Sequence, residues 1–148
     1  MREILFVGKR TDNNEWICGS LKHTKIKDFD YYEIITLDNL QSATVKPETI
    51  RQFTGLTDKN GKKIFEGDII KAYFQPQNFK NPPYAIGSVI FENGTFKVVV
   101  HVSKNSIEYK VFEKEDIAAY SIEHNFLDRY YVLEVIGNIH DNPELFGE

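Results

Sequence analysis

Hydrophobic residues fall in short runs along this chain, and each run is bounded by residues that favour turns. Short runs with Gly, Asn, Asp or Pro between them are typical of β-strands joined by tight connections. The pattern predicts one helical turn, at residues 46–50, and a short helical cap within 141–145. It predicts strands at residues 3–9, 15–21, 31–36, 42–45, 69–74, 85–91, 95–102, 107–112, 118–126 and 130–139, the last with a bulge at Gly137.

The segment of residues 52–74, QFTGLTDKNGKKIFEGDIIKAYF, predicts a hairpin, a sharp turn and then a strand. Asp58-Lys59-Asn60-Gly61 has turn chemistry, because Asp accepts a backbone N–H two residues on, and Asn and Gly tolerate a positive φ. Glu66-Gly67-Asp68 then reverses the chain. The strand that follows is apolar except for Lys71, which predicts that most of its side chains are covered on both faces.

Connections between the strands differ in composition. Asn93-Gly94 lies between two apolar runs and is a strong signal for a two-residue hairpin turn. Residues 22–28 are polar and rich in lysine, and are predicted as a connection. Residues 75–84, QPQNFKNPPY, hold three of the five prolines and predict a long loop. No linker or repeat is evident, so a single domain spanning residues 1–148 is predicted, with a sub-boundary near residues 45–52.

Composition narrows the class of protein. The 148 residues carry a net charge of −4, which argues against a protein that coats DNA. Aromatic residues make up 14% of the chain, a share that favours β structure and amphipathic surfaces. The single cysteine, Cys18, excludes an internal disulfide and is predicted to be a small buried residue. No signal peptide or membrane-spanning run is present, so a soluble protein inside the cell is predicted.

Candidate catalytic or metal-binding groups are sparse. Glu66 and Asp68 could form an acid–base pair or a cation site, but turn hydrogen bonds explain them better. Asp58 and Asn60 do not have the spacing of a calcium loop. The four histidines are scattered, and no nucleophile or phosphate-binding motif is found. The sequence therefore predicts no catalytic residue, no metal site and no cofactor.

Candidate binding residues lie in three places. Lys59, Lys62 and Lys63 form a basic group at the predicted hairpin tip, and Lys22, Lys25 and Lys27 form another in the first connection. With Phe53, Phe65 or Tyr73 nearby, such lysines could bind single-stranded nucleic acid. The alternative explanation is that lysines at a hairpin tip only keep the tip soluble and discourage edge-to-edge pairing of strands. Phe79 and Tyr84 flank the prolines of the long loop, and aromatic residues on loops often anchor protein partners.

Three blocks of the sequence resemble the YopX-like family of bacteriophage and prophage proteins. They are residues 45–70, with VKPETI, TGLTDKNGK and IFEGDII; residues 87–96, with GSVIF and NGTF; and residues 134–145, with EVIGNI and NPEL. The start of the chain is also similar, and residues 22–44, 75–84 and 103–130 match no fixed pattern. The resemblance implies a mainly β fold containing an SH3-like barrel and a phage or prophage origin. It implies no reaction, so no functional residue is carried over.

These observations together predict a mainly β fold of antiparallel strands, an SH3-like barrel with an N-terminal β extension. The predicted function is that of a phage or prophage accessory protein in the bacterial cytoplasm. It would bind a host or phage protein without catalysis, with homo-oligomer formation as a further expectation and no membrane partner. The alternatives are a nucleic-acid-binding module, or a hydrolase or metal enzyme built around Glu66, Asp68 and a histidine.

Overall fold

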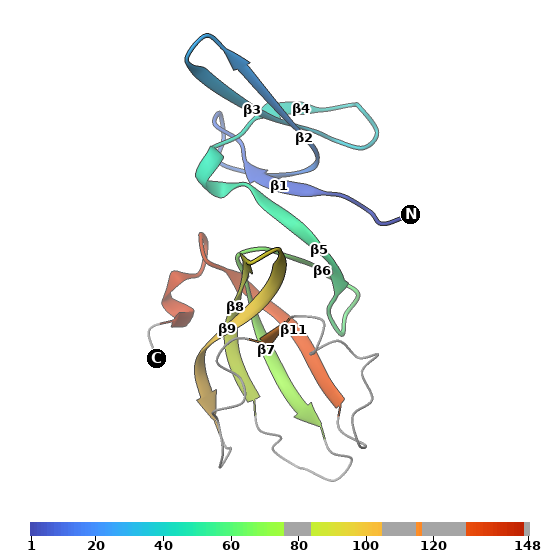
Figure 1. Cartoon of the computed structure of the whole chain (residues 1–148), viewed down its shortest axis with the longest axis vertical. Coiled ribbons are helices and arrows are strands. Elements are labelled where there is room, and N and C mark those ends of the chain that lie inside the picture. The colour runs from blue at the N-terminus through green and yellow to red at the C-terminus, as the bar shows by residue number, and fades with distance from the viewer. Residues whose placement is uncertain (76–83, 105–114, 117–129, 147–148) are drawn as a thin grey trace. The chain divides into compact units, whose positions relative to one another are not determined.

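The computed structural model describes residues 1–75, 84–104, 115–116 and 130–146 (Figure 1). Strands dominate the described chain, and the pairings recorded between them are antiparallel. The prediction of a mainly β, antiparallel fold is therefore confirmed. Contacts divide the chain into two compact units, Met1–Gly55 and Leu56–Glu148.

The first unit is an antiparallel sheet in the order β4-β3-β2-β1-β5. Its core is formed by the buried side chains of Ile17, Ile34 and Val45. A short 3₁₀ turn, η1, begins at Pro47 as expected, and Thr49 inside it accepts a hydrogen bond from the Lys9 N–H at 2.8 Å. The elements of this unit are β1 Phe6–Lys9, β2 Trp16–Ile26, β3 Phe29–Ile35, β4 Ser42–Thr44, η1 Pro47–Thr49 and the start of β5 Arg51–Thr57.

The β2–β3 hairpin is longer than the sequence predicts. Residues 22–26, predicted as part of a connection, continue β2, and the chain turns at Lys27-Asp28 with φ of 54° at Lys27. These strands lack an alternation of apolar residues, and pairs of side chains across the strands stabilise them instead. Lys22 faces Glu33, with Nζ 3.7 Å from Oε2. The rings of His23 and Tyr32 stack with their centres 4.4 Å apart.

The prediction that Cys18 is buried is wrong, because its side chain is exposed. Ile17 and Gly19, its neighbours in β2, are buried. Side chains alternate between the two faces of a strand, so Cys18 lies on the face opposite to theirs. Gly19 allows β3 to approach closely, since a Cβ there would lie 1.9 Å from the Ile35 carbonyl oxygen.

The second unit contains a sheet in the order β10-β9-β8-β7-β11, and the end of β5 lies beside β6. The predicted turn at Asn93-Gly94 joins β8 to β9, with φ of 52° and 79° at its two residues. The bulge predicted near Gly137 is confirmed by a register shift between Val135 and Gly137. The elements are β6 Lys63–Phe65, β7 Asp68–Gln75, β8 Tyr84–Glu92, β9 Thr95–Lys104, β10 Glu115–Asp116, β11 Tyr130–Asn138 and the 3₁₀ turn η3 Pro143–Phe146.

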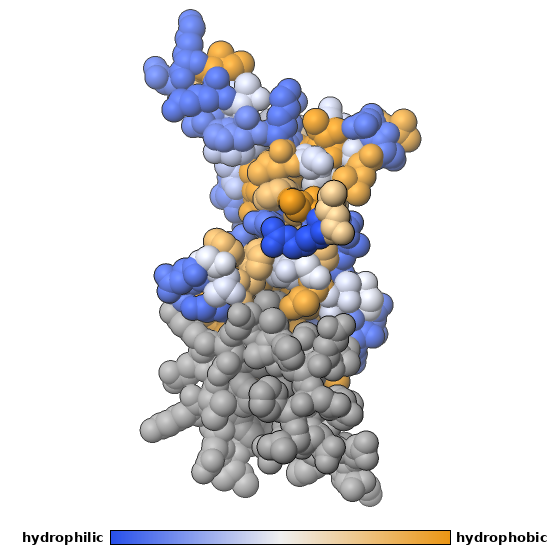
Figure 2. All heavy atoms as spheres, turned by 45° about the vertical axis from the view of Figure 1, so that its right-hand side comes forward, coloured by the Kyte–Doolittle hydropathy of each residue, from blue (hydrophilic) through white to orange (hydrophobic). Residues whose placement is uncertain are grey.

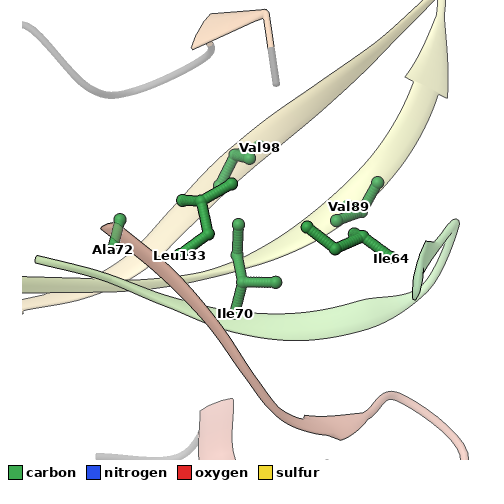
Figure 3. Packing of buried hydrophobic residues seen from close by; sticks show 6 residues of the cluster. All are labelled: Ile64, Ile70, Ala72, Val89, Val98 and Leu133. Carbon is green, nitrogen blue, oxygen red and sulfur yellow. The ribbon is translucent and has the colours of Figure 1, made fainter. Parts of the chain in front are cut away.

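The core of this unit lies on one face of the sheet. Side chains from β6, β7, β8, β9 and β11 converge there, as Figure 3 shows, and these are Ile64, Ile70, Ala72, Val89, Val98 and Leu133. Within the described residues neither sheet closes on itself, so the SH3-like barrel stays a prediction. The strands predicted at residues 107–112 and 118–126 lie outside the described residues.

Candidate functional site

A group of tyrosine and lysine side chains lies on the face of the second unit's sheet that is opposite to the core. Ile70 and Ala72 of β7 point into the core, so Lys71 and Tyr73 between and after them point the other way. Cross-strand register sets Tyr84 of β8 opposite Tyr73, and Glu134 of β11 opposite Lys71. Neighbouring strands therefore bring these side chains to one surface.

Lys71 lies between the two aromatic rings. Its Nζ is 4.1 Å from the centre of the Tyr84 ring and 4.7 Å from that of Tyr73. The ring centres are 6.4 Å apart and the planes are inclined by 54°. A cation within about 6 Å of an aromatic centroid is attracted to the ring. The ammonium group therefore holds both rings in place while the side chains stay half-buried.

Glu134 closes the group on its other side. The Tyr73 hydroxyl donates a 2.7 Å hydrogen bond to Oε2 of Glu134, and the Lys59 Nζ lies 3.1 Å from the same oxygen. Both interactions stabilise the carboxylate, with the Tyr73 hydrogen bond the larger, and they hold the pKa of Glu134 below its usual value. The Lys59 Nζ also lies 5.1 Å from the centre of the Tyr73 ring. We call Lys59, Lys71, Tyr73, Tyr84 and Glu134 the tyrosine–lysine cluster.

Asp58 positions the turn that carries Lys59. Its Oδ1 accepts the N–H groups of Asn60 and Lys62 at 2.8 and 2.9 Å, and its Oδ2 accepts the Val135 N–H of β11 at 3.0 Å. The Lys59 N–H donates to the Leu133 carbonyl at 2.9 Å. Burial alone would raise the pKa of Asp58, but the N–H donors of Val135, Lys62 and Asn60 lower it below the usual value.

The turn is therefore fixed to the edge of β11. Asp58 is only 5% exposed, and its hydrogen bonds join the hairpin tip to a strand distant in sequence. A carboxylate that accepts several backbone N–H groups constrains the local chain strongly. This anchoring explains how an exposed lysine at a hairpin tip is kept beside the tyrosines.

Predicted binding residues fall partly in this cluster. Lys59 and Tyr84 belong to it, whereas the Lys62 side chain is exposed and its backbone N–H donates a hydrogen bond to Asp58. Lys63 begins β6 and is half-buried. Phe79 lies outside the described residues.

The sequence did not point to Lys71 and Glu134 as members of the cluster. The prediction that most side chains of β7 are covered on both faces is confirmed, since Ile69 and Ile70 on opposite faces are both buried, while Lys71 and Tyr73 are half-buried. In the sequence, Lys71 and Tyr73 alternate with the apolar residues Ile70 and Ala72, and this alternation could have indicated that Lys71 lies on the face away from the core.

Two of the carboxylates that the sequence offered as catalytic or metal-binding candidates form hydrogen bonds within turns. Asp68 is buried, and its Oδ2 accepts the Phe65 N–H at 2.8 Å, which confirms the predicted turn hydrogen bonding. Asp58 forms the turn described above. In the part of the chain that the structure describes, no group of three or more His, Cys, Asp or Glu could hold a metal ion. Within the same residues, no helix is long and apolar enough to cross a membrane.

Comparisons with known proteins agree with the resemblance noted in the sequence. The model of the YopX protein family matches residues 5–147. The crystal structure of protein EF1440 from Enterococcus faecalis is similar, with 23% identity, a TM-score of 0.47 and 99% of both chains covered. No curated protein matches the chain. The family model spans nearly all of the sequence, and the chain therefore belongs to the YopX family.

Proposed function

We propose that this protein is a phage- or prophage-encoded accessory protein that binds another protein through the tyrosine–lysine cluster, without catalysis. The observation that carries the proposal is Lys71 seated between the rings of Tyr73 and Tyr84 on a regular sheet. Tyrosine is enriched among the residues that dominate binding energy at protein interfaces. Rings held in place before binding lose little conformational entropy when a partner arrives.

The charges of the cluster favour a protein partner over a nucleic acid. Lys59 is paired with Glu134, and Lys71 is engaged by two aromatic rings. The Glu134 carboxylate would repel a phosphate placed between the lysines. The net charge of −4 points the same way. The family resemblance supports a phage or prophage origin, and with it action in the cytoplasm of a bacterial host.

The test is capture of a partner by the tagged full-length protein from a lysate of prophage-carrying bacteria, read by mass spectrometry. We expect a stoichiometric partner that survives nuclease treatment and is lost with the double variant Tyr73→Ala/Tyr84→Ala. Leu40→Ala is the matched control, because Leu40 is 82% exposed and lies in the first unit. Undiminished capture by the double variant, shown to be folded by circular dichroism, would contradict the proposal.

Single-stranded nucleic acid is the second candidate ligand. The observation that favours it is the same pair of rings beside two lysines, since bases stack on aromatic side chains while lysines contact phosphates. A labelled single-stranded DNA oligonucleotide tests it by fluorescence anisotropy. The affinity should then fall steeply as the salt concentration rises, and Lys59, Lys62 and Lys63 should each account for part of that salt dependence. Glu134→Gln should raise the affinity, because it removes a negative charge. Binding that does not respond to salt would remove this candidate.

A further inference from the structure

The outer part of the β2–β3 hairpin is a two-stranded ribbon. β2 pairs with β1 only over residues 16–19, and β3 pairs with β4 only over residues 33–35. The Tyr32 carbonyl accepts one more hydrogen bond, from the Val45 N–H at 3.0 Å. Beyond Tyr32, among the residues that the structure describes, no third strand flanks the ribbon. An isolated two-stranded ribbon is only marginally stable in water.

One face of this ribbon is apolar at its end. The register pairs Ile26 with Phe29 and Thr24 with Tyr31, and these four side chains share a face because successive residues alternate. Ile26, Phe29 and Tyr31 are 56%, 67% and 46% exposed. Figure 2 shows hydrophobic atoms among hydrophilic ones at the end of this hairpin, at the top of the view. Contiguous exposed apolar side chains of this kind mark an interaction surface.

The same face ends in a charged pair. Lys22 and Glu33 are directly opposite each other, one on each strand, and lie on the face of Ile26 and Phe29. The basic residue belongs to β2 and the acidic residue to β3. The opposite face of the ribbon has the same division, with Lys25 on β2 and Asp30 on β3.

This division of charge favours face-to-face over edge-to-edge association of two copies. A two-fold axis perpendicular to the ribbon would pair β2 with β2, or β3 with β3, edge to edge and place like charges together. A two-fold axis parallel to the strands stacks the two apolar faces and puts β2 of each copy over β3 of the other. Each residue then faces the residue that is its cross-strand partner in its own copy.

We propose that the apolar face of the β2–β3 hairpin is a docking surface for the same face of a second copy of this chain. In this two-fold dimer Ile26 packs on Phe29 of the second copy, Thr24 on Tyr31, and Lys22 pairs with Glu33. The three contacts occur twice, because the interface is isologous. The covered area is small, and interfaces below about 1,200 Å² in total belong to weak, reversible complexes.

The first test is sedimentation velocity of the full-length protein over a dilution series. We expect a reversible monomer–dimer equilibrium, and Phe29→Ser should raise the dissociation constant of the dimer at least about tenfold. The control is Leu37→Ser, since Leu37 is 64% exposed but lies beyond the inner end of β3, and it should leave the equilibrium unchanged. A protein that is monomeric at every concentration, or a dimer that Phe29→Ser leaves unchanged, overturns the proposal.

A charge-exchange experiment separates contact between copies from damage within one copy. Lys22→Glu and Glu33→Lys should each prevent dimerisation, because the introduced charge faces a like charge on the second copy. An equimolar mixture of the two variants should form a 1:1 dimer, since opposite charges then meet at both contacts between positions 22 and 33. Local disturbance of the ribbon cannot be repaired by mixing. If the mixture stays monomeric while the unaltered protein dimerises, the proposed arrangement is overturned.

Discussion

The tyrosine–lysine cluster of the second unit and the end of the β2–β3 hairpin in the first unit use the same kinds of residue in different settings. Both present aromatic rings, lysines and carboxylates at the surface. The cluster rests on a sheet whose other face is a packed core, and its members contact one another. The apolar residues of the hairpin end have no such layer of their own, and they stay largely exposed.

The two surfaces differ in how far they are ordered without a partner. The members of the cluster already contact one another, so the binding proposed for it would lose little side-chain entropy. In the proposed dimer the second copy covers the apolar area of the hairpin end, so the stability of the hairpin end would then depend on association. The two surfaces therefore respond differently to the same substitution.

The largest contrast is expected for the same change, isoleucine to alanine, made in each place. Ile70 is fully buried beneath the cluster, so Ile70→Ala should lower the free energy of unfolding by about 3 kcal/mol through lost burial and a cavity. Ile26→Ala at the hairpin end should change it by less than about 0.5 kcal/mol at a concentration where the protein is monomeric. Urea unfolding measures both, and equal effects would show that Ile26 is covered in solution.

Asp58→Ala should have the next largest effect. The substitution removes the acceptor of three backbone N–H groups, those of Asn60, Lys62 and Val135, and should cost about 2 kcal/mol of stability. Lys59 would no longer be fixed beside Tyr73, so the cluster should lose its order as well. The control is Asp12→Ala, because Asp12 is an exposed turn residue paired with Arg10 and should be close to neutral.

Asp58 also makes stability depend on pH in a defined window. The pKa of Asp58 is lower in the folded protein than the ordinary value of about 3.9 in an unfolded chain. Its contribution is therefore fully present above about pH 4 and is lost as the pH falls through the folded value. Asp58→Asn should flatten this acid branch of the stability curve, measured by urea unfolding at a series of pH values. An unchanged branch would show that other carboxylates dominate it.

Sequence patterns predicted the parts of this fold that depend on neighbouring residues. The turn at Asn93-Gly94, the bulge at Gly137 and the hairpin around Asp58-Gly61 each follow from a few adjacent side chains. The outer half of the β2–β3 hairpin was missed because its strands are stabilised by polar cross-strand pairs, such as Lys22 with Glu33, that leave no apolar alternation.

The cluster was only half predictable for a related reason. Lys59 and Tyr84 were identified from local composition, but their companions come from distant strands. Tyr73 and Glu134 are 61 residues apart in sequence, and register brings them together. Only the sheet pairing of β7 with β11 reveals that contact, and no local pattern encodes it.

The smallest expected effect concerns one hydrogen bond inside the cluster. Tyr73→Phe keeps the ring and removes the hydroxyl that is the main cause of the lowered pKa of Glu134. The pKa of Glu134 should rise toward its usual value, which carbon-detected NMR titration of the carboxyl group can follow. Lys59 would still hold part of the shift through its contact at 3.1 Å. Tyr84→Phe is the matched control, because the recorded hydrogen bond to Glu134 comes from Tyr73, and it should leave the titration unchanged. A rise of equal size in both variants would mean that the rings act on Glu134 through shared packing, and the cluster would then be less ordered than the hydrogen bond implies.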